Sequence, residues 1–401
     1  MLSLFVIRED EVAPRFHGPR SCEGTLTTRE RIIIAMSGGV DSSVAAARLV
    51  DRGYDVVGVT LHMWDYPDDP TARGSHDRCC APEDQYDARR VADTLGFPHY
   101  TFDRRELFAR TVVTPFVDAY VSGETPSPCS VCNRTVKMAE LIGLADRLGA
   151  PRVATGHYAR IVRDAGSPPY LATGVDHTKD QSYFLYASPQ HWLDRLVFPL
   201  GESTKIEVRA EAISRRLPGA EKGESQELCF VGSGTHAYAD FVASRAPTRP
   251  GLIVDASGTT VGAHDGIHRF TIGQRKGVGV AVGKPAYVVR IDPDTAMVHL
   301  GDETQLLARE AILSDVTLAE GISLPLRAHV RVRYRHQAVA AHVESAADSK
   351  VKVTFDEPVR AITRGQSAVF YDADRVLGGG RIDRAIGICG EAAPSRKVVA
   401  Y

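Results

Sequence analysis

The sequence predicts an α/β protein with a parallel sheet in its N-terminal half and antiparallel β structure towards its C-terminus. Strand-like and helix-like segments alternate between residues 31 and 161, and after about Gly232 the chain changes to short alternating runs separated by Gly, Pro and Asp. The composition is that of a globular protein, with 43% hydrophobic and 24% charged residues. A length of 401 residues suits about two or three domains.

The alternation begins with a β-branched run at 31–35, which fits a buried parallel strand. Residues 41–52 have helical spacing and end at Gly53, and "YDVVGVTL" (54–61) is the next strand. A helix at 85–96, a strand at 99–103 and a further helix and strand within 144–161 repeat the pattern. This order predicts a parallel sheet with helices on both faces and a ligand at the carboxyl ends of its strands.

Two segments stand apart from this pattern. Residues 1–29 show no sustained helical or strand periodicity. We interpret them as an extension and make no prediction of whether it is ordered. The polar segment 62–84, which contains Cys79 and Cys80, is too rich in Pro and Gly to form an element and resembles a mobile active-site loop. Beyond Gly232, runs such as "PAYVVRID" and "KVTFD" favour antiparallel strands.

The net charge of the chain and its hydropathy argue against several classes of function. A net charge of −2 argues against indiscriminate nucleic-acid binding, although a balanced total can contain a basic face. No run of about 18 apolar residues occurs, which predicts no membrane span, and the acidic start does not fit a signal peptide. Seven cysteines in a chain of this length favour thiol or metal chemistry in a reducing compartment over a disulfide framework. We therefore expect a cytoplasmic protein.

The glycine turn, residues 37–43 (SGGVDSS), follows the first predicted strand and precedes a helix. Backbone N–H groups at a helix N-terminus attract anions, and glycine lets a phosphate approach the backbone closely. A Walker loop would place a lysine here, whereas this turn has Val40 and Asp41. The turn therefore fits a released pyrophosphate, with Asp41 helping to hold Mg²⁺. The alternative is a tight structural turn capped by Asp41 or Ser42.

Three cysteines outside the polar segment are candidates for sulfur chemistry. Cys129 and Cys132 form a Cys-x-x-Cys turn after two prolines, and Cys229 follows about a hundred residues later. A thiolate is the nucleophile in sulfur transfer. Two alternatives remain open: half of a zinc site completed by Cys79 and Cys80, or an iron–sulfur cluster on Cys129, Cys132 and Cys229.

Seven segments of the chain occur in a fixed order: "AMSGGVDSSVAAA", "ETPSPCSVCN", "ATGHYAR", "KDQSYFLY", "ELCFVG", "FTIGQRKGVGV" and "GQSAVFYD". In this order they resemble the tRNA-specific 2-thiouridylase family of bacteria and mitochondria. The match runs from about Arg31 to about Asp383. The glycine turn alone is similar to the PP-loop of adenylating synthetases such as GMP synthetase and argininosuccinate synthase.

The resemblance implies a chain of three domains. A Rossmann-like parallel sheet would form a PP-loop catalytic domain at 30–231, followed by a small central tRNA-binding domain at 232–305 and a C-terminal antiparallel β-barrel at 306–401. The implied activity is ATP-dependent 2-thiolation of the wobble uridine of tRNA, with ATP and Mg²⁺ bound at the glycine turn. The C2 carbonyl oxygen would be adenylated and then replaced by sulfur, with release of pyrophosphate and AMP.

The resemblance also assigns roles to the cysteines. Cys229 would carry a persulfide received from a cysteine desulfurase or a sulfur relay protein. Cys132 would cleave this persulfide and end in a disulfide with Cys229. Two thiols that are distant in sequence but able to meet suit such a division. Many family members have an aspartate in place of Cys129, and this departure favours the alternative of a [4Fe-4S] cluster.

The remaining implied site residues are contacts to the nucleotide and to tRNA. The ATP-binding positions are Ala35, Met36, Ser37, Gly38, Gly39, Val40, Asp41, Ser42, Leu61 and Gly156. The tRNA-binding positions are Ser127, Pro128, Cys129, His157, Lys179, Asp180, Gln181, Arg333, Tyr334 and Gln366. A wobble base lies in a loop, so a protein can splay it out and read its edges without melting a duplex.

Strand alternation over 329–335 (HVRVRYR) would place Arg331, Arg333 and Arg335 on one face, either as a stripe that follows phosphates or as a solubilising surface. Two other function classes stay open. One is another PP-loop adenylating synthetase, of which an amidotransferase-linked type would need a glutaminase partner. The other is a tRNA-binding or metal-binding protein without catalysis, which tRNA-stimulated cleavage of ATP to AMP and pyrophosphate would exclude.

Overall fold

The structure is a computed structural model that describes residues 29–65, 82–223, 228–232, 237–281 and 283–387. The chain divides into two compact units: unit 1 comprises the described residues of 1–111, 132–182 and 188–233, and unit 2 those of 112–131, 183–187 and 234–401. The predictions made for residues 1–28, for the loop at 66–81 and for Cys79 and Cys80 lie outside the described residues. Among the residues that are described, no helix is long and apolar enough to cross a membrane.

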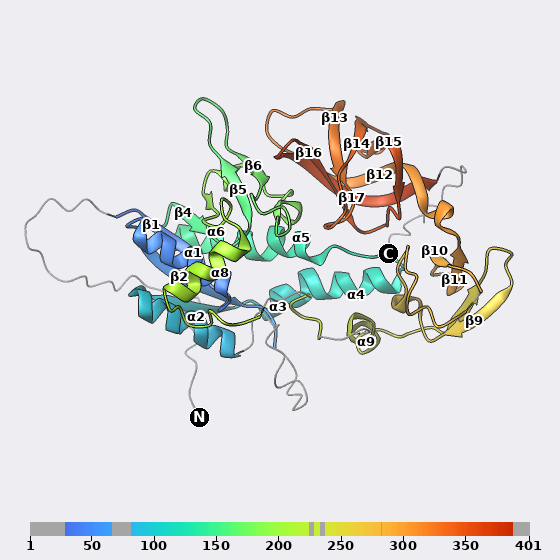
Figure 1. Ribbon diagram of the computed structural model, residues 1–401, viewed down its shortest axis with the longest axis horizontal. Helices are drawn as coiled ribbons and strands as arrows, with labels where there is room; N and C mark the ends of the chain where they lie inside the picture. The colour runs from blue at the N-terminus through green and yellow to red at the C-terminus, as the bar shows by residue number, and fades with distance from the viewer. Residues whose placement is uncertain (1–28, 66–81, 224–227, 233–236, 282, 388–401) are drawn as a thin grey trace, which may run out of the picture. The chain divides into compact units, whose positions relative to one another are not determined.

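Unit 1 is built on a five-stranded sheet of order β3-β2-β1-β4-β7, in which every neighbouring pair is parallel. Figure 1 labels three of these strands, β1, β2 and β4. The β-branched run forms the central strand, and Ile32, Ile33 and Ile34 are fully buried. A strand covered on both faces requires such a continuous apolar run. The predicted parallel sheet is therefore confirmed. Its strands are β1 (Arg31–Ala35), β2 (Asp55–His62), β3 (His99–Asp103), β4 (Arg152–Ala154) and β7 (Leu196–Val197).

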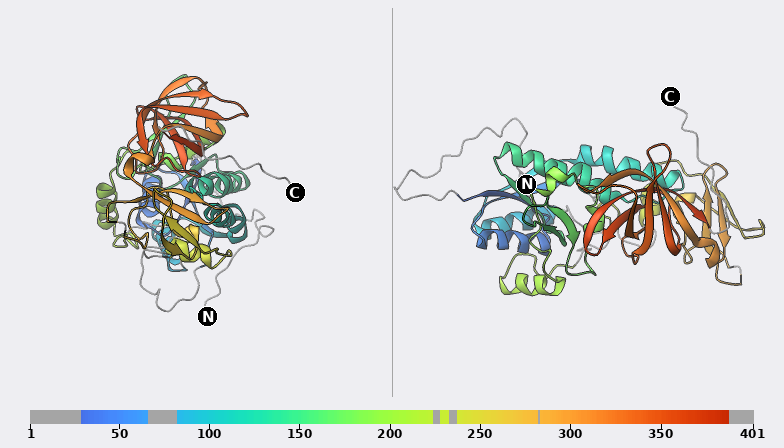
Figure 2. Two further views of the ribbon diagram at one scale, coloured as in Figure 1. Left: turned by 90° about the vertical axis from the view of Figure 1, so that its right-hand side faces the viewer. Right: turned by 90° about the horizontal axis from the view of Figure 1, so that it is seen from above.

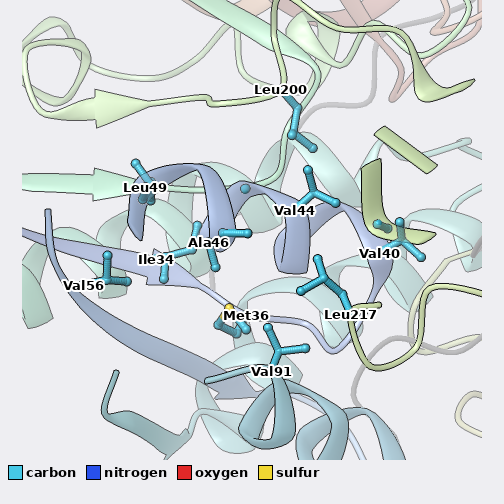
Figure 3. Packing of buried hydrophobic residues seen from close by; sticks show 14 of the residues in the cluster. Ile34, Met36, Val40, Val44, Ala46, Leu49, Val56, Val91, Leu200 and Leu217 are labelled. Atoms are coloured by element: carbon cyan, nitrogen blue, oxygen red, sulfur yellow. The ribbon is translucent and has the colours of Figure 1, made fainter. Parts of the chain in front are cut away.

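Two helices, α1 (Val40–Asp51) and α2 (Pro82–Leu95), pack against this sheet, and α8 (Lys205–Ser214) packs on α1. Their buried side chains form one cluster with β1, in which Val44, Leu49 and Val91 pack around Ile34 (Figure 3). The other elements of unit 1 are α3 (Arg105–Phe108), the π-helix η4 (Asn133–Lys137), α6 (Met138–Arg147), which packs against β1 and β4, α7 (Gln190–Leu193), and the antiparallel hairpin β5 (Ala159–Val162) and β6 (Tyr170–Thr173).

Unit 2 contains a small sheet of order β10-β11-β8-β9, whose core includes Ile253, Val288, Val298 and Leu300. The outer pairs are antiparallel, as predicted, whereas β8 and β11 pair in parallel. Its strands are β8 (Gly251–Val254), β9 (Thr260–His264), β10 (Tyr287–Asp292) and β11 (Met297–Gly301). The helical segments of unit 2 include α4 (Thr114–Val121), α9 (Ala237–Ala243), η6 (Ile267–Arg269) and η7 (Glu303–Leu306). Three further helical segments lie where the chain passes from one unit to the other: η3 (Ala109–Val113), α5 (Pro128–Cys132) and η5 (Ser182–Phe184).

The rest of unit 2 is a closed antiparallel barrel of six strands, drawn in orange and red in Figures 1 and 2. The order is β12-β15-β14-β13-β16-β17, and pairing of β12 with β17 closes it, so that no strand edge is left open. Val330, Val353, Phe355 and Phe370 fill its interior. The predicted C-terminal barrel is confirmed. Its strands are β12 (Leu307–Leu318), β13 (Leu326–Arg331), β14 (Val339–Ser345), β15 (Val351–Arg360), β16 (Ser367–Asp372) and β17 (Arg375–Gly387).

Candidate functional site

The glycine turn joins the carboxyl end of β1 to the start of α1. The Met36 N–H donates to Val59 O (2.8 Å) and the Thr60 hydroxyl donates to Met36 O (2.8 Å), so strand β2 fixes the point at which the turn leaves the sheet. α1 begins at Val40, and its N-cap residue, Gly39, has no side chain to bond the first N–H groups of the helix. N–H groups in this position bind anions.

Internal contacts fix the shape of the turn. The Ser42 hydroxyl accepts a hydrogen bond from the Ser37 N–H (3.2 Å) and donates one to Gly39 O (3.0 Å). Gly38 has a φ of +76°, and a Cβ at this position would lie 2.1 Å from the carbonyl oxygen of Asp84. Both the left-handed backbone and the close approach of α2 therefore require glycine here.

The turn itself contains no lysine, but a lysine at the start of α8 reaches it. Lys205 Nζ lies 2.7 Å from Asp41 Oδ1, and the Tyr158 hydroxyl donates to the same oxygen (2.8 Å). α8 begins at this lysine because Thr204 and Glu207 form a capping box immediately before it. The site thus combines a helix N-terminus, a carboxylate and an ammonium group at the carboxyl edge of a parallel sheet, which is where such sheets bind ligands.

Two further predicted ATP-binding residues lie near this edge. Leu61 is buried in β2, just beyond Val59, which is the parallel partner of Ala35. Gly156 follows β4, and a Cβ at this position would lie 3.0 Å from the backbone carbonyl carbon of Asp41. The structure therefore brings Gly156 against the backbone of the glycine turn, where a larger residue would collide with it.

Cys129 and Cys132 lie in α5, a single helical turn that continues into the π-helix η4. Cys129 and Cys229 are half-buried, and Cys132 is buried. Burial raises the pKa of Cys132, while the ammonium group and the backbone N–H of Lys137 act in the opposite direction. Lys137, at the end of the π-turn, is therefore the group that favours the Cys132 thiolate. Helices with such a turn recur at functional sites.

Cys229 adjoins an aromatic cluster in unit 1. The next residue, Phe230, is buried, and its ring packs edge-on against Trp64 and Phe108, with centroid distances of 6.2 Å and 5.5 Å. Aromatic rings in this arrangement attract each other beyond the burial of their surface. The cluster thus anchors the half-buried Cys229. The part of the chain that is described contains no group of three or more His, Cys, Asp and Glu side chains that could hold a metal ion.

His157 is half-buried beside Gly156. Its Nδ1 lies 2.6 Å from Thr155 Oγ1, and its ring packs edge-on against Phe198. Burial, and to a smaller extent the Lys137 ammonium group, lower the pKa of His157 to about 3. The imidazole is therefore neutral at physiological pH, with one nitrogen that donates and one that accepts.

Residues 179–181, expected at the tRNA, differ in their surroundings. Gln181 is joined to Tyr158 by two hydrogen bonds, from its N–H to Tyr158 O (2.8 Å) and from the Tyr158 N–H to its Oε1 (2.9 Å). Asp180 is buried, and its carboxylate accepts from the N–H and the hydroxyl of Ser182 (both 3.0 Å). Lys179 is half-buried. The buried carboxylate of Asp180 therefore stabilises the conformation of this segment through internal hydrogen bonds.

The predicted alternation over 329–335 was wrong beyond Arg331. β13 ends at Arg331, and the chain turns over residues 332–335. The Arg333 guanidinium donates to Ile272 O (3.0 Å) and to the Thr363 hydroxyl, so it does not belong to a regular stripe of strand side chains. The prediction of a continuous strand failed because a buried guanidinium must meet hydrogen-bond acceptors, and the acceptors of Arg333 come from distant parts of the sequence.

Tyr334 and Gln366, the other expected tRNA contacts in unit 2, also have internal partners. The Tyr334 ring packs on Phe184 with a centroid distance of 4.5 Å. Gln366 Nε2 donates to the backbone carbonyl oxygens of residues 125 and 126, at 3.0 Å each. The structure therefore brings Gln366 next to the segment that leads into residues 127–129, which are the expected contacts to the target base.

Sequence reasoning missed Lys205, Tyr158 and Lys137. A signal for Lys205 exists, because Thr204-x-x-Glu207 is a capping-box pattern and places a helix N-terminus at this point. No such signal identifies the other two, since Tyr158 reaches Asp41 only through the packing of β4 beside β1, and Lys137 faces Cys132 only because the helix between them contains a π-turn.

Three family models match the chain. They are described as the tRNA methyl transferase HUP domain, over residues 30–233, the tRNA methyl transferase PRC-barrel domain, over 239–302, and the aminomethyltransferase β-barrel domain, over 304–382. A solved structure of NMN synthetase from Francisella tularensis covers 49% of this chain and 66% of its own, at 18% identity and a TM-score of 0.30. That likeness is too weak for a comparison of sites.

Curated relatives match over nearly their whole length. The chain is 58% identical over 380 residues to the tRNA-specific 2-thiouridylase MnmA of Sorangium cellulosum, in an alignment that covers 92% of this chain and 97% of that protein. It is 45% identical over 366 residues to the tRNA-specific 2-thiouridylase MnmA of Geobacter metallireducens, with 90% and 99% of the two chains covered. Since these alignments include all three matched domains, the full-length relatives decide the family.

Proposed function

Because this chain belongs to the tRNA-specific 2-thiouridylase family, we propose that it performs ATP-dependent 2-thiolation of the wobble uridine of tRNA. Family membership makes it a tRNA sulfurtransferase with a PP-loop domain that thiolates uridine. The observation that supports the finer proposal is the meeting of Asp41 and Lys205 at the glycine turn, 2.7 Å apart. A triphosphate suits this site, because the N–H groups of the turn and the ammonium group both attract its charge.

In the first step, the C2 carbonyl oxygen of the uridine attacks the α-phosphorus of ATP. A new P–O bond forms, and pyrophosphate leaves with the electron pair of the broken bond. The N–H groups of the glycine turn and Lys205 would stabilise the charge on the leaving group, which is the largest contribution that a protein makes to such reactions. The Asp41 carboxylate fits Mg²⁺, which proteins commonly hold with one or two carboxylates together with phosphates; when bound it neutralises phosphate charge.

The second step is assigned to Cys229 and Cys132. The terminal sulfur of a persulfide on Cys229 bonds to C2 of the adenylated uridine, and AMP leaves with the former carbonyl oxygen. The Cys132 thiolate then attacks Cys229 Sγ; the persulfide S–S bond breaks, its electron pair stays with the sulfur on C2, and a disulfide forms between the cysteines. A cysteine desulfurase or a relay protein would supply the sulfur, and a thiol reductant would restore both cysteines.

The tRNA contacts follow the same assignment. Ser127, Pro128, Cys129 and the neutral imidazole of His157 would receive the splayed-out base, while Lys179, Asp180, Gln181, Arg333, Tyr334 and Gln366 would contact the surrounding anticodon loop. Residues 30–231 are assigned to catalysis, 232–305 to a central tRNA-binding domain and 306–401 to the C-terminal barrel.

The test uses the full chain, purified anaerobically, with iron and labile sulfide measured before each assay. Unmodified tRNA, ATP and Mg²⁺ are supplied with sulfur either as sulfide or through a cysteine desulfurase. We expect AMP, pyrophosphate and 2-thiouridine in equal amounts without iron. The substitutions Cys132→Ser and Cys229→Ser should abolish thiolation from the desulfurase and leave tRNA-dependent pyrophosphate release in place.

Two outcomes would change the assignment. Activity that follows stoichiometric iron, and is lost together with iron in Cys129→Ala, would make the three cysteines ligands of a cluster that acts on the same substrate. ATP that is not cleaved to AMP and pyrophosphate in the presence of tRNA would contradict the adenylation step and leave a tRNA-binding protein.

A further inference from the structure

Glu124 is a buried carboxylate in the segment that precedes α5, and two arginines of the barrel region bind it within unit 2. Its side chain is 8% exposed. Arg364 Nε lies 3.0 Å from Glu124 Oε1, and Arg381 Nη2 is bonded to Glu124 Oε2. Each carboxylate oxygen therefore has its own guanidinium. A buried charge requires such pairing, and losing one partner costs far more than losing an exposed one.

The backbone after Glu124 is held by the same part of unit 2. The Thr125 N–H donates to Arg364 O (3.0 Å), and Gln366 Nε2 donates to the carbonyl oxygens of both Thr125 and Pro126 (3.0 Å each). Gly365 has a φ of +90°, and a Cβ there would lie 2.9 Å from Thr125 O. We call these contacts, made by residues 364–366 and Arg381 with residues 124–126, the barrel clamp.

The clamp uses the donor groups of Gln366. A glutamine amide nitrogen has two N–H groups, and both contacts of Nε2 are to carbonyl oxygens of the clamped segment. A nucleotide at this position would meet the amide oxygen, which can only accept. The geometry accordingly gives Gln366 a function in holding the protein chain through its amide nitrogen, in addition to the tRNA contact proposed above, for which its amide oxygen remains.

The segment from Glu124 to the cysteines of α5 is short, and prolines restrict its backbone conformation. Pro126 and Pro128 fix the backbone φ at two positions, and α5 begins at Pro128 and contains Cys129 and Cys132. A displacement at Glu124 is therefore carried along the chain towards the reacting thiol. Because misplacement of reacting groups by about 1 Å can lower a rate about 100-fold, a fixed start for α5 matters for the chemistry.

We propose that Glu124 and Gln366 are positioning residues, which hold the start of α5 against the barrel so that the target base and the cysteines meet in a productive arrangement. The proposal rests on the proposed function, because it takes residues 127–132 as the segment that meets the base. It assigns to the barrel a part in the chemical step in addition to any part in tRNA binding.

The test compares two variants of the full chain with a matched control. Glu124→Gln removes the paired charge with little change of shape, and Gln366→Met removes the two hydrogen bonds. Asp356→Asn makes the same carboxylate-to-amide change in the exposed pair with Arg327 on the barrel surface. The single-turnover thiolation rate is measured at tRNA concentrations that saturate each variant, and the tRNA dissociation constant is measured separately.

We expect the saturated rate to fall about 10- to 100-fold in both variants and to remain unchanged in the control. Amide hydrogen exchange should become faster in residues 125–132 and stay unchanged in the barrel strands, a pattern that general destabilisation would not produce. A saturated rate equal to that of the unaltered chain in either variant overturns the proposal, and a weaker tRNA affinity with such a rate would leave Gln366 as a tRNA contact only.

Failure of the proposed function is separable from failure of this inference. An unaltered chain that does not thiolate tRNA would end the former, while hydrogen exchange in the same two variants still decides whether the clamp holds residues 125–132. If Glu124→Gln does not fold, Gln366→Met alone decides, because losing two neutral hydrogen bonds at a partly buried site costs much less than leaving a buried charge unpaired.

Discussion

Lys205 Nζ lies 2.7 Å from Asp41 Oδ1, although 164 residues separate the two in the chain. The lysine side chain is 14% exposed and the aspartate side chain 34%, and the Tyr158 hydroxyl donates to the same carboxylate oxygen. An ammonium group held in this way is available to a phosphate that approaches the turn, because a charge-assisted bond to one oxygen can be replaced by a bond to another. Although the PP-loop of this protein contains no lysine, α8 supplies one to the same site.

The first prediction concerns this lysine. Lys205→Met should lower the rate of tRNA-dependent pyrophosphate release about 100-fold and raise the KM for ATP, because the leaving group loses a cation. Arg215→Met is the matched control, since it removes a cation that pairs with Asp51 at the opposite end of α1. Rapid-quench measurement with labelled ATP gives both parameters. Unaltered pyrophosphate release in Lys205→Met would show that the lysine only stabilises Asp41.

The second prediction separates backbone conformation from close packing at the glycine turn. Gly53→Ala introduces a Cβ at a φ of +81° with no atom within 4 Å, so only the left-handed backbone is strained, at a cost of about 1–2 kcal/mol. Gly38→Ala has the same conformational cost and also places Cβ 2.1 Å from Asp84 O, so we expect at least about 3 kcal/mol. Urea unfolding measures both values. Equal losses would mean that α2 moves freely away from the turn.

The elements around the glycine turn could be predicted from sequence because their signals are local. The strand at 31–35 and the helix that begins at residue 40 or 41 follow from a continuous apolar run, a glycine pair and helical spacing, all within about twenty residues. The parallel sheet follows from the same alternation repeated. The barrel was expected from resemblance, since short alternating runs alone do not say whether a sheet closes.

The side-chain partners of the candidate site could not be predicted in the same way. Lys205 reaches Asp41 only because α8 packs on α1, where Arg48 bonds Glu211 of α8 (2.6 Å). Arg333 turns towards Ile272 because the barrel strand stops at Arg331. Both depend on contacts between residues far apart in sequence, and local patterns carry no information on such pairs.

The third prediction is a pH dependence of stability due to His157. Its pKa in the folded chain is about 3, lowered mainly by burial, against 6.5 for an ordinary histidine. Below pH 6.5 the unfolded chain therefore binds a proton that the folded chain does not, so stability falls as pH decreases from about 6.5 towards about 3. This one group should contribute at most about 2 kcal/mol of loss between pH 7 and pH 5.

His157→Asn should reduce this loss, because asparagine does not titrate. Urea unfolding at pH 7, 6 and 5 measures the slope for the unaltered chain and for the variant. The control is His342→Asn, which replaces a histidine on the exposed side of β14. A slope that is the same in all three proteins would mean that His157 is protonated in the folded chain, and its expected action as a neutral partner of the target base would then be wrong.

The last prediction concerns the reactivity of Cys132. Burial raises the pKa of its thiol, and Lys137 opposes that effect through its ammonium group and its backbone N–H. Lys137→Met keeps the N–H and removes the charge, so the pKa should rise further. A rise of one unit lowers the thiolate fraction, and with it the rate of modification by iodoacetamide at neutral pH, about tenfold.

Modification of Cys132 is followed by peptide mass spectrometry between pH 7 and pH 10, and the rate should increase with pH along a curve that Lys137→Met shifts to higher pH. Arg134→Met is the control, because Arg134 is exposed on the same π-turn and its loss changes the net charge equally. Identical curves for all three proteins would mean that the ammonium group does not act on the thiol. Since the reaction needs neither ATP nor tRNA, the result tests the local electrostatics of Cys132 independently of every assignment made to the catalytic cycle.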